Sequence, residues 1–207
     1  LNIDDLSYNF KYKGKNLKLE NFIPIENLKT KIDFNGTIKG TKQKFSLTSN
    51  LNSKEGQFHT SYKNIRGRLM VINDEKLTGD FDGYIGELSY NDIEFKDFKV
   101  ALNYKNGIFK VLEIRNNLLT IKGDYNIINK TLDFDYKIRG IKENKIKLLE
   151  KYGVKINLEE VDGSLKGELE DFKINFSSLN TWVQYNNLPK IYLKGKIQFY
   201  NQNIYFK

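Results

Sequence analysis

The chain has 207 residues and a formal net charge of +8, and hydrophobic residues make up 39% of it. This apolar content is enough to order a β-rich domain, so a wholly disordered chain is excluded. Cysteine is absent, which excludes disulfides, cysteine-ligated zinc and thiol catalysis.

Short segments in which apolar and polar residues alternate recur along the N-terminal half. A period of two is typical of a β-strand with one wet face and one buried face. We expect short turns between these strands, one of them at residues 53–56. The alternating apolar positions are Leu6, Tyr8, Phe10, Tyr12, Leu17, Leu19, Leu28, Ile32, Phe34, Ile38, Phe45, Leu47, Phe58, Tyr62, Ile65, Leu69, Val71, Leu77, Phe81, Ile85, Phe98, Val100, Leu102 and Tyr104.

The C-terminal half continues the same pattern, so we expect about a dozen strands in all. Its alternating apolar positions are Leu119, Ile121, Tyr125, Ile127, Leu132, Phe134, Tyr136, Ile138, Val161, Leu165, Leu169, Phe172, Ile174, Phe176, Ile191, Leu193, Ile197 and Phe199. A short unit repeated without a break in composition predicts one continuous quasi-repetitive domain over residues 1–207.

Two segments depart from the alternation. Residues 141–152 have apolar side chains at helical spacing and end at Gly153, which predicts a short helix. Residues 177–189, which contain the single tryptophan, Trp182, are expected to form a loop.

Glycine stands repeatedly in the apolar phase of the strands, where it costs backbone entropy and leaves no side chain to pack. One interpretation is that these glycines let a twisted sheet bend, with neighbouring aromatic rings covering the bare backbone. The other is that they keep the apolar face open as a trough. The positions are Gly36, Gly40, Gly67, Gly79, Gly83, Gly123, Gly163, Gly167 and Gly195.

A single sheet with one apolar face needs something to cover that face. About twelve strands at a spacing of about 4.8 Å would extend about 55–60 Å. Apolar patches above a few hundred Å² normally have a partner. The sheet is therefore expected to fold over, to dimerise or to hold an apolar ligand.

The repeated segments "GTIKG" and "GSLKG" resemble the AsmA/TamB group of bacterial envelope proteins, which includes the translocation and assembly module. Residues 95–127 and 148–176 carry the closest likeness. The resemblance implies an all-β, mainly one-sheet half-pipe (a β-taco or groove) with an apolar concave face. It also implies a role in moving phospholipids between the inner and outer membranes, or in outer-membrane protein assembly.

We therefore expect a non-enzymatic, lipid-conducting groove without a cofactor. Its partners would be phospholipid acyl chains and, by resemblance, an outer-membrane β-barrel assembly protein. It would lie in the periplasm as a piece of a longer protein, held by an inner-membrane anchor outside this chain. The expected groove-lining residues are Ile32, Phe34, Gly36, Ile38, Phe81, Ile85, Phe98, Val100, Leu102, Ile121, Tyr125, Phe134, Tyr136, Ile138, Leu165, Leu169, Phe172, Ile174, Leu193, Ile197 and Phe199.

Sequence motifs for catalysis or metal binding are missing. The single histidine, His59, occupies a polar-phase position, and no Ser-His-Asp set, HExxH motif or phosphate-binding loop occurs. Asp80, Asp82 and Glu87 hint at calcium, but their spacing does not fit an EF-hand loop.

The positive charge does not point to nucleic acid. The lysines are spread over the polar phase of many strands, and Arg66 and Arg68 form the single close arginine pair. The alternative to the groove is a structural or adhesive β-solenoid or sandwich whose apolar face is a dry core.

Overall fold

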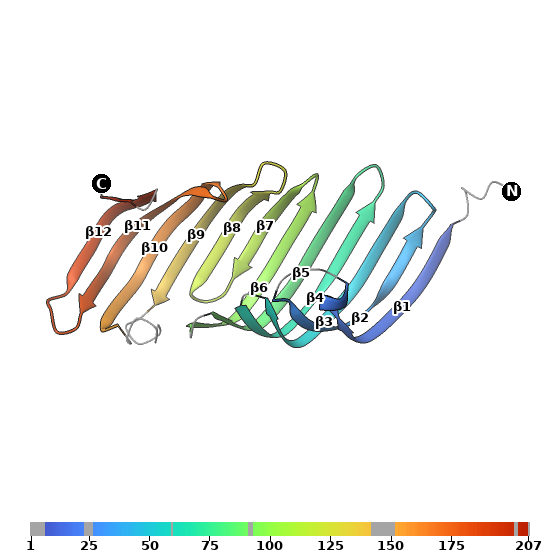
Figure 1. Ribbon diagram of the computed structural model, residues 1–207, viewed down its shortest axis with the longest axis horizontal. Helices are drawn as coiled ribbons and strands as arrows, with labels where there is room; N and C mark the ends of the chain where they lie inside the picture. The colour runs from blue at the N-terminus through green and yellow to red at the C-terminus, as the bar shows by residue number, and fades with distance from the viewer. Residues whose placement is uncertain are drawn as a thin grey trace. The chain divides into compact units, whose positions relative to one another are not determined.

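The protein is an antiparallel all-β meander, as the alternation predicts. The computed structural model describes residues 7–22, 27–58, 60–90, 93–141, 152–200 and 203–206. The order of the 13 strands follows the chain from β1 to β13 (Figure 1). The 13 strands confirm the prediction of about a dozen strands that follow one another along the chain.

Backbone contacts divide the chain into two compact units, which we describe one at a time. Unit 1 comprises residues 1–90 and 94–107, and unit 2 comprises residues 91–93 and 108–207. The single continuous domain stays a prediction.

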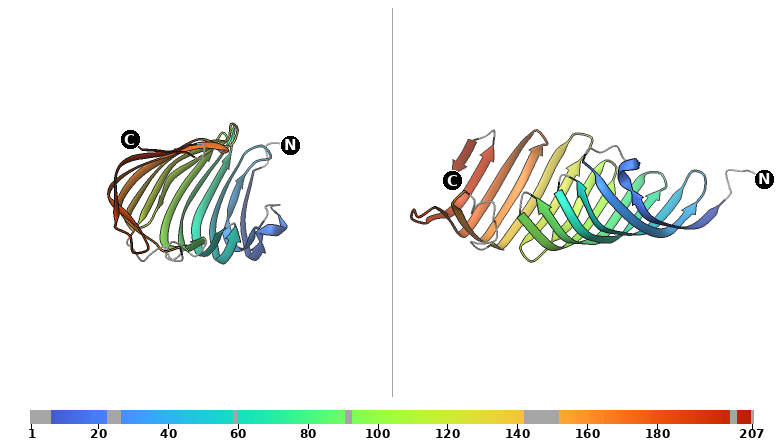
Figure 2. Two further views of the ribbon diagram at one scale, coloured as in Figure 1. Left: turned by 60° about the vertical axis from the view of Figure 1, so that its left-hand side comes forward. Right: turned by 60° about the horizontal axis from the view of Figure 1, so that its bottom comes forward.

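Unit 1 contains the first six strands and one short 3-10 helix that the alternation does not reveal. These elements are β1 (Tyr8–Lys18), η2 (Leu19–Asn21), β2 (Lys29–Gly40), β3 (Phe45–Phe58), β4 (Thr60–Asn73), β5 (Leu77–Tyr90) and β6 (Ile93–Lys105). The strands of this unit curve along their length (Figure 2).

The register of unit 1 aligns its apolar positions in rows that cross the strands. Ile38 on β2 stands opposite Phe10 on β1 and Leu47 on β3, and Leu47 stands opposite Val71 on β4. Residues directly opposite in an antiparallel pair point to the same face. Alternation along each strand therefore becomes a continuous apolar row across four strands.

A line of irregularities crosses β3 to β6 in unit 1. On β4, Asn64 has a φ of 57° and stands between paired neighbours, and on β6 Asp97 has a φ of 62°. The register of β4 with β3 and with β5 is the same on both sides of Asn64, so no strand gains a residue over its partner; instead the paired strands turn their side chains by one position together. For this reason the apolar phase is even at Tyr62 and odd from Ile65 onward. The turn expected at residues 53–56 is wrong, because this segment lies inside β3 at the same line.

Unit 2 contains the remaining seven strands. They are β7 (Ile108–Arg115), β8 (Leu119–Asn126), β9 (Thr131–Ile141), β10 (Val154–Glu168), β11 (Asp171–Tyr185), β12 (Ile191–Tyr200) and β13 (Asn203–Phe206). Apolar rows cross these strands as they do in unit 1. In one row, Ile121 on β8 stands opposite Tyr136 on β9, followed by Gly163 on β10 and Phe176 on β11.

Two expectations for unit 2 have different outcomes. The helix predicted over residues 141–152 falls almost wholly on residues 142–151, which lie outside the described residues; Ile141 ends β9. The loop predicted over residues 177–189 is wrong in its first part, because β11 continues to Tyr185. Trp182 on β11 pairs in register with Asn157 on β10 and Tyr192 on β12. Pairing with both neighbouring strands therefore keeps this segment extended, although its sequence lacks the alternation of the other strands.

Few apolar side chains are fully buried. Within the described residues, the buried hydrophobic side chains are Tyr62, Phe98, Val100 and Val161. Most side chains of the apolar rows are half-buried, which is the burial expected of a sheet covered on one face by little besides its own side chains.

Candidate functional site

The predicted groove residues of unit 1 lie on three of its strands. Ile32, Phe34, Gly36 and Ile38 alternate along β2, Phe81 and Ile85 lie on β5, and Phe98, Val100 and Leu102 lie on β6. All are half-buried except Phe98 and Val100, whose exposed fractions are 2% and 5%.

Aromatic rings occupy the space beside several glycines of unit 1. A Cβ atom added to Gly14 would fall on the ring of Phe34 from the neighbouring strand. The Phe81 ring would lie 2.6 Å from a Cβ added to either Gly67 or Gly83. These glycines are therefore covered by rings, as the first of the two sequence interpretations expects.

Tyrosines extend this arrangement by a hydrogen bond to the strand beyond. Tyr12 on β1 reaches across Gly36 on β2, and its hydroxyl donates to the carbonyl oxygen of Thr48 on β3 at 3.2 Å. In unit 2, Tyr136 on β9 crosses Gly163 on β10 and donates to Asn175 O on β11, also at 3.2 Å. Each tyrosine thus lies flat across its neighbour and ties three strands together.

The predicted groove residues of unit 2 come from five strands, β8 to β12, apart from Leu169. The half-buried ones are Ile121, Tyr125, Phe134, Tyr136, Ile138, Leu165, Phe172 and Ile174, on β8 to β11. Leu193, Ile197 and Phe199 belong to β12, where the backbones of Ile197 and Phe199 pair with Phe176 and Ile174.

Leu169 is the exception among the predicted residues. It lies in the turn between β10 and β11, and 49% of its surface is exposed. The alternation from Val161 onward continues past the end of the strand by chance. Glu168 and Asp171 are the last pair of the two strands, and they flank the turn that contains Leu169. Leu169 therefore does not join the rows.

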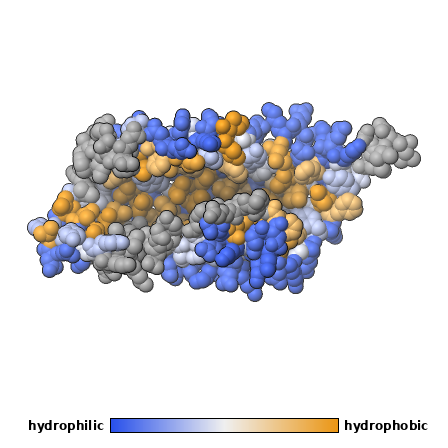
Figure 3. Space-filling view, in the orientation of Figure 1, coloured by the Kyte–Doolittle hydropathy of each residue, from blue (hydrophilic) through white to orange (hydrophobic). Residues whose placement is uncertain are grey.

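The hydropathy of the surface follows the rows. In each unit, hydrophobic residues gather over the middle of the strands on the face shown in Figure 3, and hydrophilic residues lie towards the strand ends.

Burial raises the pKa of Tyr136 above its ordinary value, because a phenolate would lose hydration among these side chains.

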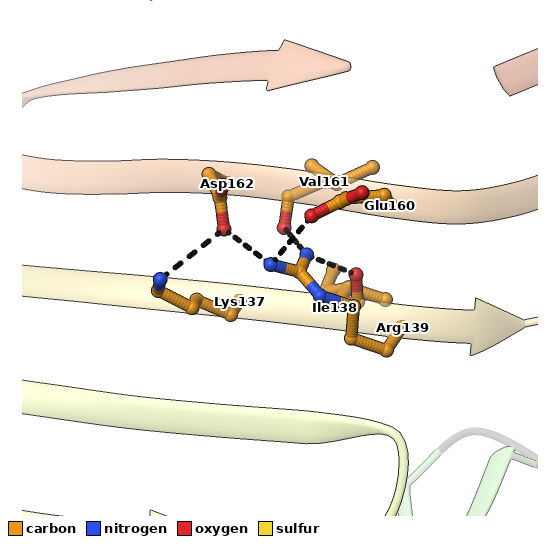
Figure 4. A network of polar contacts seen from close by, with 6 residues as sticks. All are labelled: Lys137, Ile138, Arg139, Glu160, Val161 and Asp162. Atoms are coloured by element: carbon orange, nitrogen blue, oxygen red, sulfur yellow. Dashed lines mark hydrogen bonds and ion pairs between the residues drawn. The ribbon is translucent and has the colours of Figure 1, made fainter. Parts of the chain in front are cut away.

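The polar phase of unit 2 is joined across strands by charge pairs. Arg139 on β9 contacts Glu160 at 2.9 Å and Asp162 at 3.1 Å on β10, and it also donates to the carbonyl oxygen of its neighbour Ile138 (Figure 4). Lys137 approaches Asp162 at 3.9 Å. These pairs fix β9 against β10 on the face opposite to the rows.

Sequence reasoning missed a cavity of about 500 Å³ in unit 1, on the far side of the line of irregularities that crosses β3 to β6. Its lining combines Lys63 with Glu87, whose side chains are joined at 2.6 Å, and with Glu20 of η2. The signal that could have located it is the switch of the apolar phase between Tyr62 and Ile65. Such a switch marks a residue with irregular backbone, here Asn64, beyond which the side chains change face.

No evidence for a metal centre comes from the described residues, which contain no group of three His, Cys, Asp or Glu side chains able to hold a metal ion. Glu87 bonds Lys63, and Asp80 accepts a hydrogen bond from Asn103 at 2.8 Å. His59 lies outside the described residues.

A search of the described part of the chain finds no helix with the length and hydropathy of a membrane span.

Comparisons with protein-family models, with curated proteins and with solved structures return no match to this chain. The residues and their geometry therefore carry the functional argument.

Proposed function

We propose that this protein is a non-enzymatic β-groove that binds the acyl chains of phospholipids. The observation that supports this proposal most directly is the set of apolar rows. They run across consecutive strands of each unit, and most of their side chains are half-buried. In this proposal the rows line the concave side of a curled half-pipe. Each CH₂ group transferred from water to such a lining contributes about 0.8 kcal/mol.

The aromatic rings over glycine support this use of the rows. A ring lying flat on the backbone gives an apolar surface without deep pockets or projecting side chains. Successive strands then offer similar environments, so a chain could move along the rows with little change in free energy. Release into water would remain costly because the whole apolar surface of the lipid would be exposed.

The proposal places this groove in a cell envelope, between two membranes, in line with the resemblance to the AsmA/TamB group. A β-barrel assembly partner and an inner-membrane anchor belong to that same proposal. The dry-core alternative is less favoured, because a packed core would bury the rows to native density, whereas most of their described side chains are half-buried.

Binding of a fluorescent fatty acid such as cis-parinaric acid to the purified chain tests the proposal. Ile38→Asp places a carboxylate in a row, and Lys39→Asp places the same group one residue away on the opposite face. In unit 2, Ile121→Asp and Thr120→Asp form an equivalent pair. We expect each row variant to weaken binding at least tenfold and each control to leave it unchanged. No binding by the wild type, or equal loss in both members of a pair, would contradict the proposal.

A further inference from the structure

The hairpin formed by β11 and β12 in unit 2 ends in a turn surrounded by exposed apolar side chains (Figure 1). Leu188 in the turn and Ile191 and Tyr192 at the start of β12 are 59%, 64% and 71% exposed, and Tyr185 at the end of β11 is exposed as well. We call these four residues, together with Trp182, the hairpin tip. Exposed apolar side chains gathered at one place mark a contact with a protein or with a membrane.

The hairpin tip is apolar on both of its faces. Trp182 pairs with Tyr192, and Val183 pairs with Ile191. Neighbouring residues of a strand point to opposite faces, so Tyr185 and Ile191 share the face of the apolar rows, whereas Trp182 and Tyr192 lie on the other face. A protein partner that docks on one face would leave the second face in water. A lipid medium surrounds a tip on all sides and covers both.

Hydrogen bonds within the protein hold the turn in this shape. The backbone N–H of Leu188 donates to Tyr185 O at 3.0 Å, and Gln184 Nε2 donates to Leu188 O at 2.8 Å. The N–H of Asn186 donates to Gly153 O, before β10, at 2.6 Å. Backbone groups that are satisfied internally lower the cost of bringing the turn into a less polar medium.

The segment that contains the hairpin tip carries only positive charge. Residues 172–207 contain five lysines and neither aspartate nor glutamate. Lys190 is exposed beside the turn, and its Nζ lies 3.9 Å from the centre of the Trp182 ring. Lys155 on β10, which pairs with Gln184, is exposed at the same end of the strands. A surface that is both apolar and basic complements a bilayer that carries negative charge.

We propose that the hairpin tip docks to the surface of a lipid bilayer that contains anionic lipids. Leu188 enters the boundary between headgroups and acyl chains, where its apolar side chain leaves water. The rings of Trp182 and Tyr192 lie at the depth of the headgroups, because each has an apolar body and a polar group that can bond water or phosphate. Lys190 attracts the lipid phosphates. This docking goes beyond the binding of acyl chains by the rows, since a bilayer can be bound without any lipid leaving it.

Sedimentation of the purified chain with vesicles tests the proposal. We expect vesicles of phosphatidylcholine and phosphatidylglycerol in equal parts to bind the chain about tenfold more tightly than phosphatidylcholine alone at low salt, and added salt to weaken this binding. Trp182 is the single tryptophan, so its emission reports on the tip and should shift to shorter wavelength. No sedimentation with the anionic vesicles would overturn the proposal and leave a protein as the partner of the tip. An unchanged emission spectrum on bound vesicles would overturn it too.

A matched pair of variants connects the binding to the tip. Leu188→Asp and Leu169→Asp each change an exposed leucine in a hairpin turn of unit 2, at opposite ends of β11. We expect Leu188→Asp to weaken binding to anionic vesicles about tenfold, because it removes the inserted side chain and adds a negative charge, and Leu169→Asp to leave it unchanged. Lys190→Gln should weaken it about fivefold. Equal loss in both leucine variants, or unchanged binding in both Leu188→Asp and Lys190→Gln, would overturn the proposal.

The row variant Ile121→Asp separates docking from the binding of acyl chains. We expect it to weaken parinaric acid binding and to keep vesicle binding, whereas Leu188→Asp should do the reverse. Loss of vesicle binding in Ile121→Asp as large as in Leu188→Asp would show that the rows contact the bilayer, and would overturn the docking proposal. Failure of the acyl-chain proposal is distinct, because the wild type would then sediment with anionic vesicles without binding parinaric acid.

Discussion

Gly56→Ala tests whether aromatic rings over glycine hold unit 1 together. The three atoms nearest to an added Cβ all belong to the Tyr62 side chain, so the ring has to move. Tyr62 is only 8% exposed, and its hydroxyl lies 3.0 Å from Ser53 Oγ. The substitution therefore displaces a buried ring and breaks this hydrogen bond.

The magnitude follows from three contributions. Overpacking of a well-packed site costs about 1–3 kcal/mol, and a lost hydrogen bond costs about 1 kcal/mol. Replacing glycine by alanine lowers the entropy of the unfolded chain and returns about 0.4–1 kcal/mol. We expect a net loss of about 2 kcal/mol in the free energy of unfolding.

Urea denaturation followed by tyrosine and tryptophan fluorescence measures this loss. Gly79→Ala is the matched control in the same unit, because an added Cβ there would lie 3.7 Å from Met70 O and 3.9 Å from Tyr104 Cβ, which is ordinary contact. We expect the control to be neutral or slightly stabilising. Equal midpoints for Gly56→Ala and Gly79→Ala would refute the reasoning.

Three further predictions concern unit 2. Tyr136→Phe removes the hydrogen bond to Asn175 O and should lower the free energy of unfolding by about 1 kcal/mol in urea. Because burial raises the pKa of Tyr136, its contribution to stability is complete below the unfolded pKa near 10 and falls as the pH rises through the higher folded value; Tyr136→Phe should reduce this loss in alkaline melts. Arg139→Gln should cost at most about 1 kcal/mol, with a smaller effect at high salt, because Arg139, Glu160 and Asp162 are partly exposed. A larger, salt-independent loss would contradict that surface role.

Much of the fold could be predicted because alternation is a local property. A period of two fixes which residues share a face, and it placed Ile38, Phe81 and Phe134 on strands correctly. It was wrong at Leu169, where a chance apolar residue continues the pattern into a turn. It was also wrong at residues 53–56, where polar residues and glycine suggested a turn inside a continuous strand.

The candidate site was predictable in part for the same reason. The apolar residues of the rows were identified by their phase, but the cavity in unit 1 was not. Its residues come from six elements, from η2 to β6, and share no local pattern. Only the register, together with the left-handed backbone at Asn64 and Asp97, brings them near one another.

The sequence by itself determined most of the strands, their antiparallel succession, and the face to which most apolar side chains belong. The tertiary structure decided which residue stands opposite which, since alternation does not set the pairing register. That register places Phe34 over Gly14 and Tyr136 over Gly163. Glycine is tolerated in these strands because a ring from the next strand takes the place of the missing side chain, a relation between strands that no single strand encodes.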